Sequence, residues 1–391
     1  MKEKNILRLI IGSEKRQAYT VPLLAILCSL IVSAILLLFM GKNPLTAFQS
    51  ILAGAGVLPK PNYAGGRGMF TDIMMTLSAL TPMIFASLAV TVAFKGGLFN
   101  IGISGQMLLS GFISTVLIGY SELPAFLAMP LVLIIGTICG AFVGSIIGLL
   151  KAKFNINEVV SSIMLNYIIM YIISFFIQTR FIDPITRQSI EINSSARLVF
   201  QNVEVGPYRA VLPFFVVLAV AAALAMRFFL NRTRAGFDLR AVGLNARAAR
   251  YLGIKPKLNI MVAMIISGGL AGLAGVTHYL GFQGAIPTRE LASTGFDAIA
   301  VALLGNVTPL GSLFASVLIT VISQGTTYMS SVLGVQREIA QVMTGFILLF
   351  SACGAFIKQH VNSSNVTSED TGTNNNVTDN SITEDASFRE Q

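Results

Sequence analysis

The sequence has no tryptophan, only three cysteines and two histidines among its 391 residues, and a charged fraction of only 12%. Soluble globular domains carry about twice that charged fraction, because charge keeps their surfaces hydrated. Three cysteines without paired spacing exclude a disulfide framework. The two histidines, His278 and His360, are far apart in the sequence, so no metal-binding or catalytic cluster is visible. These scarcities argue against a soluble domain and against a membrane-embedded enzyme.

The chain also lacks the usual energy sources of a transport protein. Its only Gly-Lys pair, Gly41–Lys42, is followed by Asn43, so no phosphate-binding loop of the form Gly-x-x-x-x-Gly-Lys-Ser/Thr occurs. Ion-coupled carriers place ionisable groups inside their spans, whereas here Asp72 and Glu158 lie at the ends of apolar runs. Uphill transport would therefore need a partner ATPase; an ion-coupled secondary carrier is the less favoured alternative, and passive flow stays open.

Apolar length is what the sequence has in abundance. Hydrophobic residues make up 54% of the chain, and the mean hydropathy is +0.74. A helix of about 20 apolar residues crosses a bilayer. Ten candidate runs cover residues 20–40, 71–94, 99–118, 125–150, 158–178, 210–230, 259–280, 293–307, 309–328 and 338–357, of which 293–307 is short and interrupted. The pattern predicts an all-α polytopic membrane protein with about ten transmembrane helices.

The basic residues follow this topology. An even number of spans puts both termini on one side, and with the N-terminus inside, about two-thirds of the 27 Lys and Arg residues fall in inside segments. We therefore predict a basic cytoplasmic N-terminus over residues 1–19, a transmembrane domain over 20–357 and an acidic cytoplasmic tail over 358–391. The tail is rich in Asn, Ser, Thr, Asp and Glu, and this composition predicts disorder.

Two blocks of four spans, residues 71–178 and 259–357, have opposite orientations in this topology. Each contains a glycine-rich interruption, Lys95–Gly105 in the first block and Gly295–Gly311 in the second. Paired interruptions in inverted repeats indicate a central substrate path. Glycines that only allow close helix packing are the alternative, and both interpretations stay open.

The longest internal cytoplasmic loop, over residues 231–258, is strongly basic. Asn245–Leu252 contains good helix formers, with Asn245 placed to cap a helix and Gly253 placed to end it. A short basic helix on the membrane surface is suited to dock in a groove of another protein. An ordinary basic loop held by anionic lipid is the alternative.

Four segments carry a family resemblance: Phe94–Leu109, Asn157–Tyr167, Gly236–Arg250 and Gly295–Gly305. They resemble the signature segments of the bacterial permeases of ABC importers for branched-chain amino acids and simple sugars, and most of all the nucleoside permeases of that family. The similarity covers about residues 15–357, in order and without large gaps.

The resemblance implies a transport subunit of the bacterial cell membrane that is not itself an enzyme. It implies inverted repeats with short interrupted helices near the centre, a second homologous permease, and an extracytoplasmic binding lipoprotein that delivers nucleosides or related ribose-type sugars. It also implies a separate ATP-binding cassette subunit that binds the ATP, so no cofactor or metal is expected in this chain. Permeases for simple sugars or branched-chain amino acids remain the alternatives.

The same resemblance implies two sets of functional residues, and no catalytic ones. The loop over 231–258 matches the segment that couples such permeases to the ATPase; its candidates are Arg240, Gly243, Asn245, Arg247, Ala248, Ala249 and Gly253. The candidates for the substrate path are Phe94, Phe99, Asn100, Gln106, Asn166 and Asn306. Amides can both donate and accept hydrogen bonds, which suits polyhydroxyl or base groups, although amides that bond across helices as packing contacts are the alternative.

Overall fold

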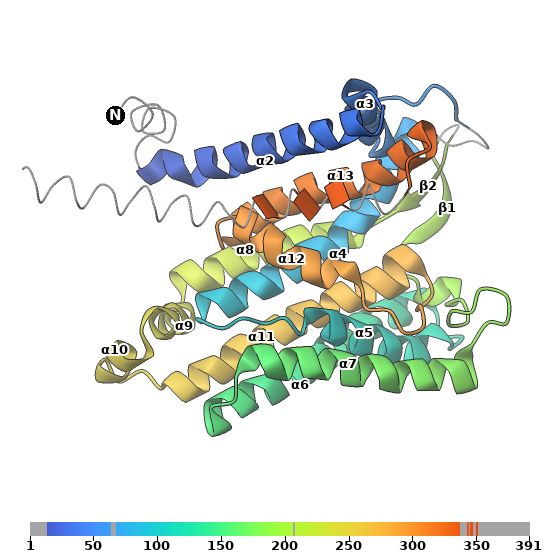
Figure 1. The fold of residues 1–391 in the computed structure, drawn as a ribbon. Helices are drawn as coiled ribbons and strands as arrows, with labels where there is room; N and C mark the ends of the chain where they lie inside the picture. Colours follow the sequence, from blue (N-terminus) through green and yellow to red (C-terminus); the bar gives the residue numbers. More distant parts are fainter. Residues whose placement is uncertain are drawn as a thin grey trace, which may run out of the picture.

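A computed structural model describes residues 14–63, 68–205, 208–336 and the six residues 342, 343, 345, 346, 349 and 350. The predicted tail over 358–391 and most of the predicted span over 338–357 lie outside the described residues. The helices are α2 (Glu14–Phe39), α3 (Pro44–Gly54), α4 (Met69–Lys95), α5 (Ile103–Ser114), α6 (Ala125–Phe154), α7 (Glu158–Phe176), α8 (Phe215–Arg232), α9 (Arg234–Leu244), α10 (Ala246–Tyr251), α11 (Pro256–Val276), α12 (Ser293–Leu304) and α13 (Pro309–Leu333) (Figure 1). Short π-helical segments extend α5 to Gly119, α7 to Phe181 and α11 to Gln283.

The apolar runs that fall within the described residues coincide with helices, which confirms an all-α polytopic membrane protein. Six helices of the described part are long and apolar enough to cross a membrane, and α2 with α3 forms a further candidate span that is bent by 118°. Two shorter apolar helices, Ile103–Gly119 and Ser293–Leu304, match the two interrupted runs. The predicted total of ten is not confirmed, because the last predicted run is largely outside the described residues.

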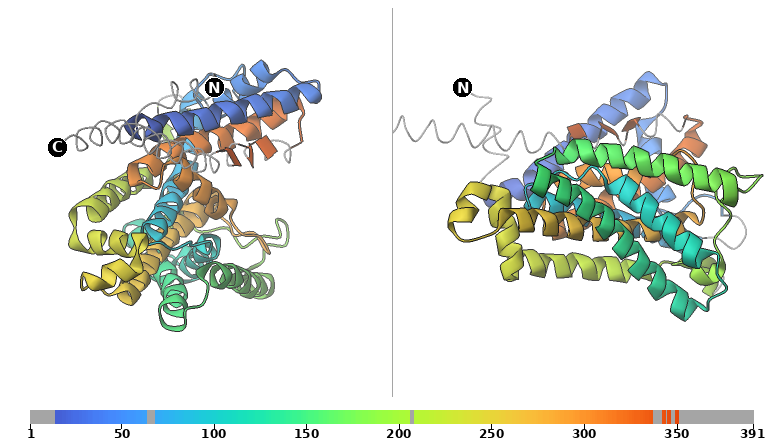
Figure 2. Two further views of the ribbon diagram at one scale, coloured as in Figure 1. Left: turned by 60° about the vertical axis from the view of Figure 1, so that its left-hand side comes forward. Right: turned by 90° about the horizontal axis from the view of Figure 1, so that it is seen from below.

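Helix α3 was not predicted, since its sequence was assigned to a polar connection. The side chain of Asn43 accepts a hydrogen bond from the backbone N–H of Leu45 at 2.9 Å, and Pro44 occupies the first turn, where its missing N–H has no cost. The helix folds back onto α13, and a small separate core that includes Leu37, Ile51 and Met329 joins α2, α3 and α13 (Figures 1 and 2).

The predicted span over 210–230 begins later than expected. Strand β1 (Phe200–Val205) pairs antiparallel with β2 (Tyr208–Leu212), so helix α8 starts only at Phe215. The register joins Phe200 to Leu212, with an irregularity before Val203. This hairpin is a small exception to the all-α prediction, and it covers one end of the bundle (Figure 1).

Helices α4 and α11 form the centre of the bundle. In their most apolar windows, 83% of α4 and 67% of α11 is buried, compared with 28% of α6 and 17% of α8. Helix α4 packs on α12 and α13, just as α11 packs on α5 and α6, and the two central helices also pack on each other. This exchange of partners is the arrangement that two related repeats would produce.

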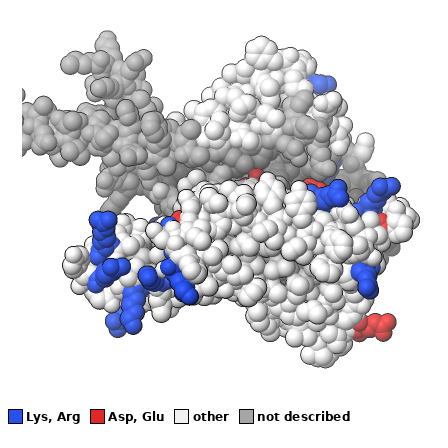
Figure 3. Space-filling view, turned by 60° about the horizontal axis from the view of Figure 1, so that its bottom comes forward, with Lys and Arg blue, Asp and Glu red and all other residues white. Residues whose placement is uncertain are grey.

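Lysine and arginine side chains gather at the two ends of the molecule, with an almost uncharged belt between them (Figure 3). We call one end, where α4, α6 and α8 finish and α11 starts, the basic end. Its cations include Lys95, Lys151, Lys153, Arg232, Arg234, Arg240, Arg247, Arg250, Lys255 and Lys257. The uncharged belt is where the bilayer is expected to surround the protein.

Helices α6 and α11 approach each other through glycine. A Cβ atom on Gly272 would overlap the carbonyl oxygen of Gly136, and one on Gly140 would lie 2.7 Å from the Cα of Gly272. Small residues of this kind let helix backbones approach closely within a membrane, where dispersion contacts replace the hydrophobic effect. These glycines are therefore packing residues between α6 and α11.

We predict that Gly272→Ala destabilises the bundle by about 2 kcal/mol, because the added methyl group forces the two helices apart. Gly269→Ala on the same helix is the matched control: its Cβ would meet nothing closer than 3.4 Å, and alanine is a better helix former than glycine. Unfolding of both variants in mixed detergent micelles measures the difference. Equal stabilities would contradict the contact.

Candidate functional site

Two short helices meet end to end in the middle of the bundle. The chain leaves α4 at Lys95 and starts α5 only at Ile103, and it leaves the extension of α11 at Gln283 and starts α12 only at Ser293. The hydroxyl of Ser104 donates to the carbonyl oxygen of Ala292 at 2.9 Å, and a Cβ on Gly295 would lie 2.7 Å from the Ser104 nitrogen. The two helix N-termini, each with a partial positive charge, therefore face the same region.

The first predicted interruption, Lys95–Gly105, lies at this position, but the second, Gly295–Gly311, was misplaced. The non-helical segment of the second block precedes α12, over residues 284–292. Gly295 belongs to the first turn of α12, where it allows the close approach to Ser104. Gly305 and Gly311 pack against each other in the tight turn to α13. A glycine-rich segment in the sequence can mark either a break in a helix or a close contact between two helices, and glycine content alone does not distinguish the two.

The amides of Asn100 and Asn166 satisfy the backbone of the first break. Asn100 Oδ1 accepts from the N–H of Gly102 at 3.0 Å, and Asn166 Oδ1 accepts from the N–H of Gly105 at 2.9 Å. Asn166 Nδ2 also donates to the carbonyl oxygen of Ile101 at 3.0 Å. Both side chains are almost fully buried, and they replace the bonds that a continuous helix would provide.

Asn100 also bonds to Gln106 and connects this network to the two central helices through Ser267. Asn100 Nδ2 donates to Gln106 Oε1 at 3.2 Å and to Ser267 Oγ of α11 at 2.9 Å. The Ser267 hydroxyl in turn donates to the carbonyl oxygen of Ala89 in α4 at 2.8 Å. The three predicted amides thus bond across helices, as the packing alternative described.

The remaining predicted path residues lie closer to the basic end. The rings of Phe94 and Phe99 form a tilted pair with centroids 5.2 Å apart, on either side of the turn that follows α4. Asn306 lies in the exposed turn between α12 and α13, with a φ of 55°. The structure therefore brings Asn100, Gln106 and Asn166 together at the first break. Asn306 lies apart from them, in the turn between α12 and α13.

A row of hydroxyl groups between α4 and α13 was missed by the sequence analysis. The hydroxyls of Thr91 and Ser312 are 2.7 Å apart, and those of Ser87 and Ser316 are 3.0 Å apart. Thr320 continues the row along α13, and its hydroxyl is buried without a hydrogen-bond partner. The signal was present in the sequence, because Ser87 and Thr91 of one run and Ser312, Ser316 and Thr320 of the other are spaced four residues apart.

At the basic end, the predicted short helix over Asn245–Leu252 is confirmed as α10. Asn245 Oδ1 accepts from the N–H groups of Arg247 at 3.0 Å and Ala248 at 3.1 Å, and Gly253 has a φ of +76° after the helix ends. Helix α9 precedes it, starting after Thr233, whose side chain accepts from the N–H of Gly236. The capping residues read from the sequence therefore set the bounds of α10.

The seven predicted coupling residues divide into two groups. Gly243, Ala249 and Arg240 face the chain itself: a Cβ on Gly243 would lie 2.8 Å from the nitrogen of Gly97, Ala249 is buried, and the Arg240 Nε atom is buried without a hydrogen-bond partner. The other four are exposed: Asn245, Arg247, Ala248 and Gly253.

Three large apolar side chains stand beside the exposed group and were not predicted. Leu244 is 89% exposed, Tyr251 93% and Leu252 71%. Such a concentration of exposed apolar surface next to arginines is typical of a protein contact. We call Leu244, Arg247, Ala248, Tyr251 and Leu252 the α10 surface.

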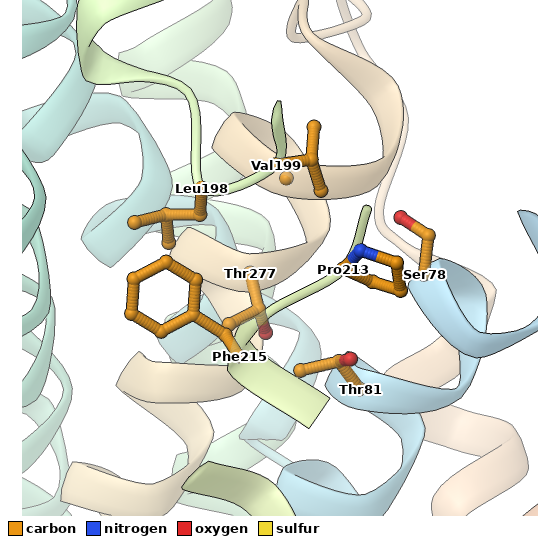
Figure 4. A pocket seen from close by; sticks show the side chains of 8 residues that line it. Ser78, Thr81, Leu198, Val199, Pro213, Phe215 and Thr277 are labelled. Carbon is orange, nitrogen blue, oxygen red and sulfur yellow. The ribbon is translucent and has the colours of Figure 1, made fainter. Parts of the chain in front are cut away.

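The opposite end is closed by the connection between α7 and α8. The N–H of Ser189 donates to the carbonyl oxygen of Ile286 at 2.9 Å, and that of Asn193 donates to Gly119 at 3.0 Å. Under the β-hairpin, a cavity of about 10 Å³ is lined by residues that include Ser78, Thr81 and Thr277 (Figure 4). A cavity of this size has room for about one water molecule and cannot hold a larger solute.

A multi-pass bundle with two short helices that meet at its centre, and with an exposed basic helix at one end, defines the class of membrane permeases. The family described as the branched-chain amino acid transport system permease component matches residues 73–352, and the chain belongs to this family. Its members are the permease components of ABC transporters, and they are not themselves enzymes.

Several relatives match almost the whole chain. The nucleoside ABC transporter permease protein NupB of Lactococcus lactis is 34% identical, over 87% of this chain and 92% of its own length. The guanosine ABC transporter permease protein NupP of Bacillus subtilis is 35% identical, over 86% and 94%. The glucose ABC transporter permease protein TsgB13 of Haloferax volcanii is 28% identical, over 88% and 89%.

We predict that Asn166→Ala lowers the free energy of unfolding by about 2 kcal/mol, because the buried N–H of Gly105 and the carbonyl of Ile101 lose their partner. Gln188→Ala, an exposed amide at the opposite end, is the control and should leave stability unchanged. Thermal unfolding of both purified variants in the same detergent tests this. An unchanged midpoint for Asn166→Ala would show that water or another group replaces the amide.

Proposed function

We propose that this chain is the membrane-spanning subunit of an ATP-driven importer for nucleosides or related ribose-type sugars. A separate ATP-binding cassette subunit would supply the energy, a second homologous permease would complete the membrane part, and an extracytoplasmic lipoprotein would deliver the solute. The observation that carries the proposal is the match, at 34% and 35% identity over most of the chain, to relatives named as nucleoside and guanosine permeases. The relative named for glucose, at 28%, supports a simple sugar as the second candidate.

The α10 surface is the proposed contact with the ATPase. It combines exposed leucine and tyrosine side chains with Arg247, and Asn245 holds its helix in place. Arg240, Gly243 and Ala249 would contribute indirectly, by packing α9 and α10 against α4 and α11 of the same chain. The excess of Lys and Arg favours a cytoplasmic location of the basic end, in a bacterial cell membrane with both termini inside.

The proposed substrate path passes the meeting point of α5 and α12. Oxygen atoms of a ribose or a base are electron-rich, and two helix N-termini with amide side chains supply donors to such atoms. Asn100, Gln106 and Asn166 would exchange bonds with the solute, Phe94 and Phe99 would contact its ring, and Asn306 would lie where the solute leaves. The closed opposite end would then open when the lipoprotein docks on residues 179–208.

Uptake by a strain that lacks this gene, compared with the complemented strain, tests the substrate class. We expect labelled guanosine to accumulate only in the complemented strain, with glucose and leucine unaffected. Accumulation of glucose alone would support the second candidate, and accumulation of leucine alone would overturn the proposal. As a control for the energy source, the purified chain alone in lipid vesicles should show no concentrative uptake.

We predict that Ala248→Glu reduces guanosine uptake about tenfold or more, because an unpaired carboxylate would be buried in the ATPase contact. Asn62→Asp adds the same charge at the opposite end, at an exposed position outside residues 179–208, and should retain uptake. Amounts of each variant in the membrane are measured by immunoblot. Normal uptake by Ala248→Glu would rule out the α10 surface as the contact. Gly243→Arg is unsuitable, because its side chain would collide with Gly97 of the same chain.

A further inference from the structure

A cavity of about 470 Å³ opens on the surface where α10 turns into α11. It is lined by Arg250, Gly253, Ile254, Lys255, Pro256, Lys257 and Leu258. We propose that this cavity binds the phosphate headgroup of an anionic phospholipid. The proposal concerns a site distinct from the substrate path, and it does not depend on which solute is transported.

Carboxylates of the described residues do not balance the charges around the cavity. Arg250, Lys255 and Lys257 are exposed, and none of the three takes part in an ion pair within the part of the chain that the structure describes. Asp238 is the only carboxylate residue between Glu204 and Glu290 in the sequence. Three cations around one concave surface therefore attract anions from outside the described part of the chain, and a phosphate group accepts hydrogen bonds from several of them at once.

The apolar part of the lining argues for a lipid rather than a soluble anion. Leu258 is 58% exposed and Ile254 is half-buried, and both line the same cavity as the cations. Pro256 begins the candidate span Pro256–Gln283, so Leu258 lies in its first turn. A phospholipid matches this arrangement, because its phosphate would contact the cations and its acyl chain would contact the apolar residues.

The position also separates this site from the α10 surface. Lys255 is the N-cap of α11, Lys257 and Leu258 lie in its first turn at the start of a candidate membrane span, and none of the three belongs to the α10 surface. Arg250 and Gly253 connect the two regions, because Arg250 ends α10 and Gly253 turns the chain toward α11. A bound headgroup would therefore fix the end of α10 against α11.

Binding is tested with the purified full chain in detergent, by adding dioleoyl phosphatidylglycerol, dioleoyl phosphatidylcholine or inorganic phosphate. We expect the wild type to bind phosphatidylglycerol about tenfold more tightly than phosphatidylcholine, and to bind inorganic phosphate weakly. The triple variant Arg250→Gln, Lys255→Gln, Lys257→Gln should lose this preference. Native mass spectrometry of the lipid-bound fractions gives both affinities, and circular dichroism verifies that the variant is folded.

The matched control removes three exposed cations elsewhere at the basic end, through Lys153→Gln, Arg232→Gln and Arg234→Gln. It should keep the preference for phosphatidylglycerol. An equal loss in both triple variants would mean that the whole basic end attracts lipid without a site, and would overturn the proposal. Tight binding of inorganic phosphate without a lipid preference would also overturn it, as would an unchanged lipid preference in the cavity variant accompanied by lost binding of the ATPase.

Discussion

The need to satisfy backbone hydrogen bonds in an apolar environment is the constraint on which this structure depends. A helix that stops halfway through a membrane leaves N–H and carbonyl groups that water cannot reach. Here the side chains of Asn100 and Asn166 form hydrogen bonds with those groups. Asn100 also bonds to Gln106 and to Ser267, and Ser267 connects the network to both central helices. The break before α5 is therefore a stable part of the fold. Its hydrogen bonds are made by neutral amides and hydroxyls, so its centre is polar without a charged residue.

Glycine provides the second condition for this architecture. Close approach of α6 to α11 and of α12 to α5 is possible only where no Cβ intervenes, at Gly272 and Gly295 respectively. The consequence is a dense centre in which α4 and α11 are surrounded by protein, while α6 and α8 keep large exposed apolar surfaces. Polarity and close packing thus coincide at the meeting point of the two short helices.

Much of this was predictable, because apolar length and capping residues act locally. The long helices followed from runs of about 20 apolar residues, and the bounds of α10 followed from Asn245 and Gly253. The direction in which a residue faces was not predictable in the same way. In a membrane, lipid-facing and protein-facing surfaces are both apolar, so periodicity does not separate them. Gly243 was therefore assigned to a partner although it packs on Gly97, and the exposure of Tyr251 was missed.

The paired hydroxyls of α4 and α13 define the alignment of these helices only to within one helical turn. Ser87 and Thr91 of α4 are four residues apart, as are Ser312, Ser316 and Thr320 of α13, so a displacement of about 6 Å would set Thr91 opposite Ser316 and Ser87 opposite Thr320. That alternative alignment would contain as many hydroxyl pairs as the observed one, and it would use the Thr320 hydroxyl that now has no partner. Hydrogen bonding along this seam is therefore degenerate, and only the surrounding apolar contacts select one of the two positions.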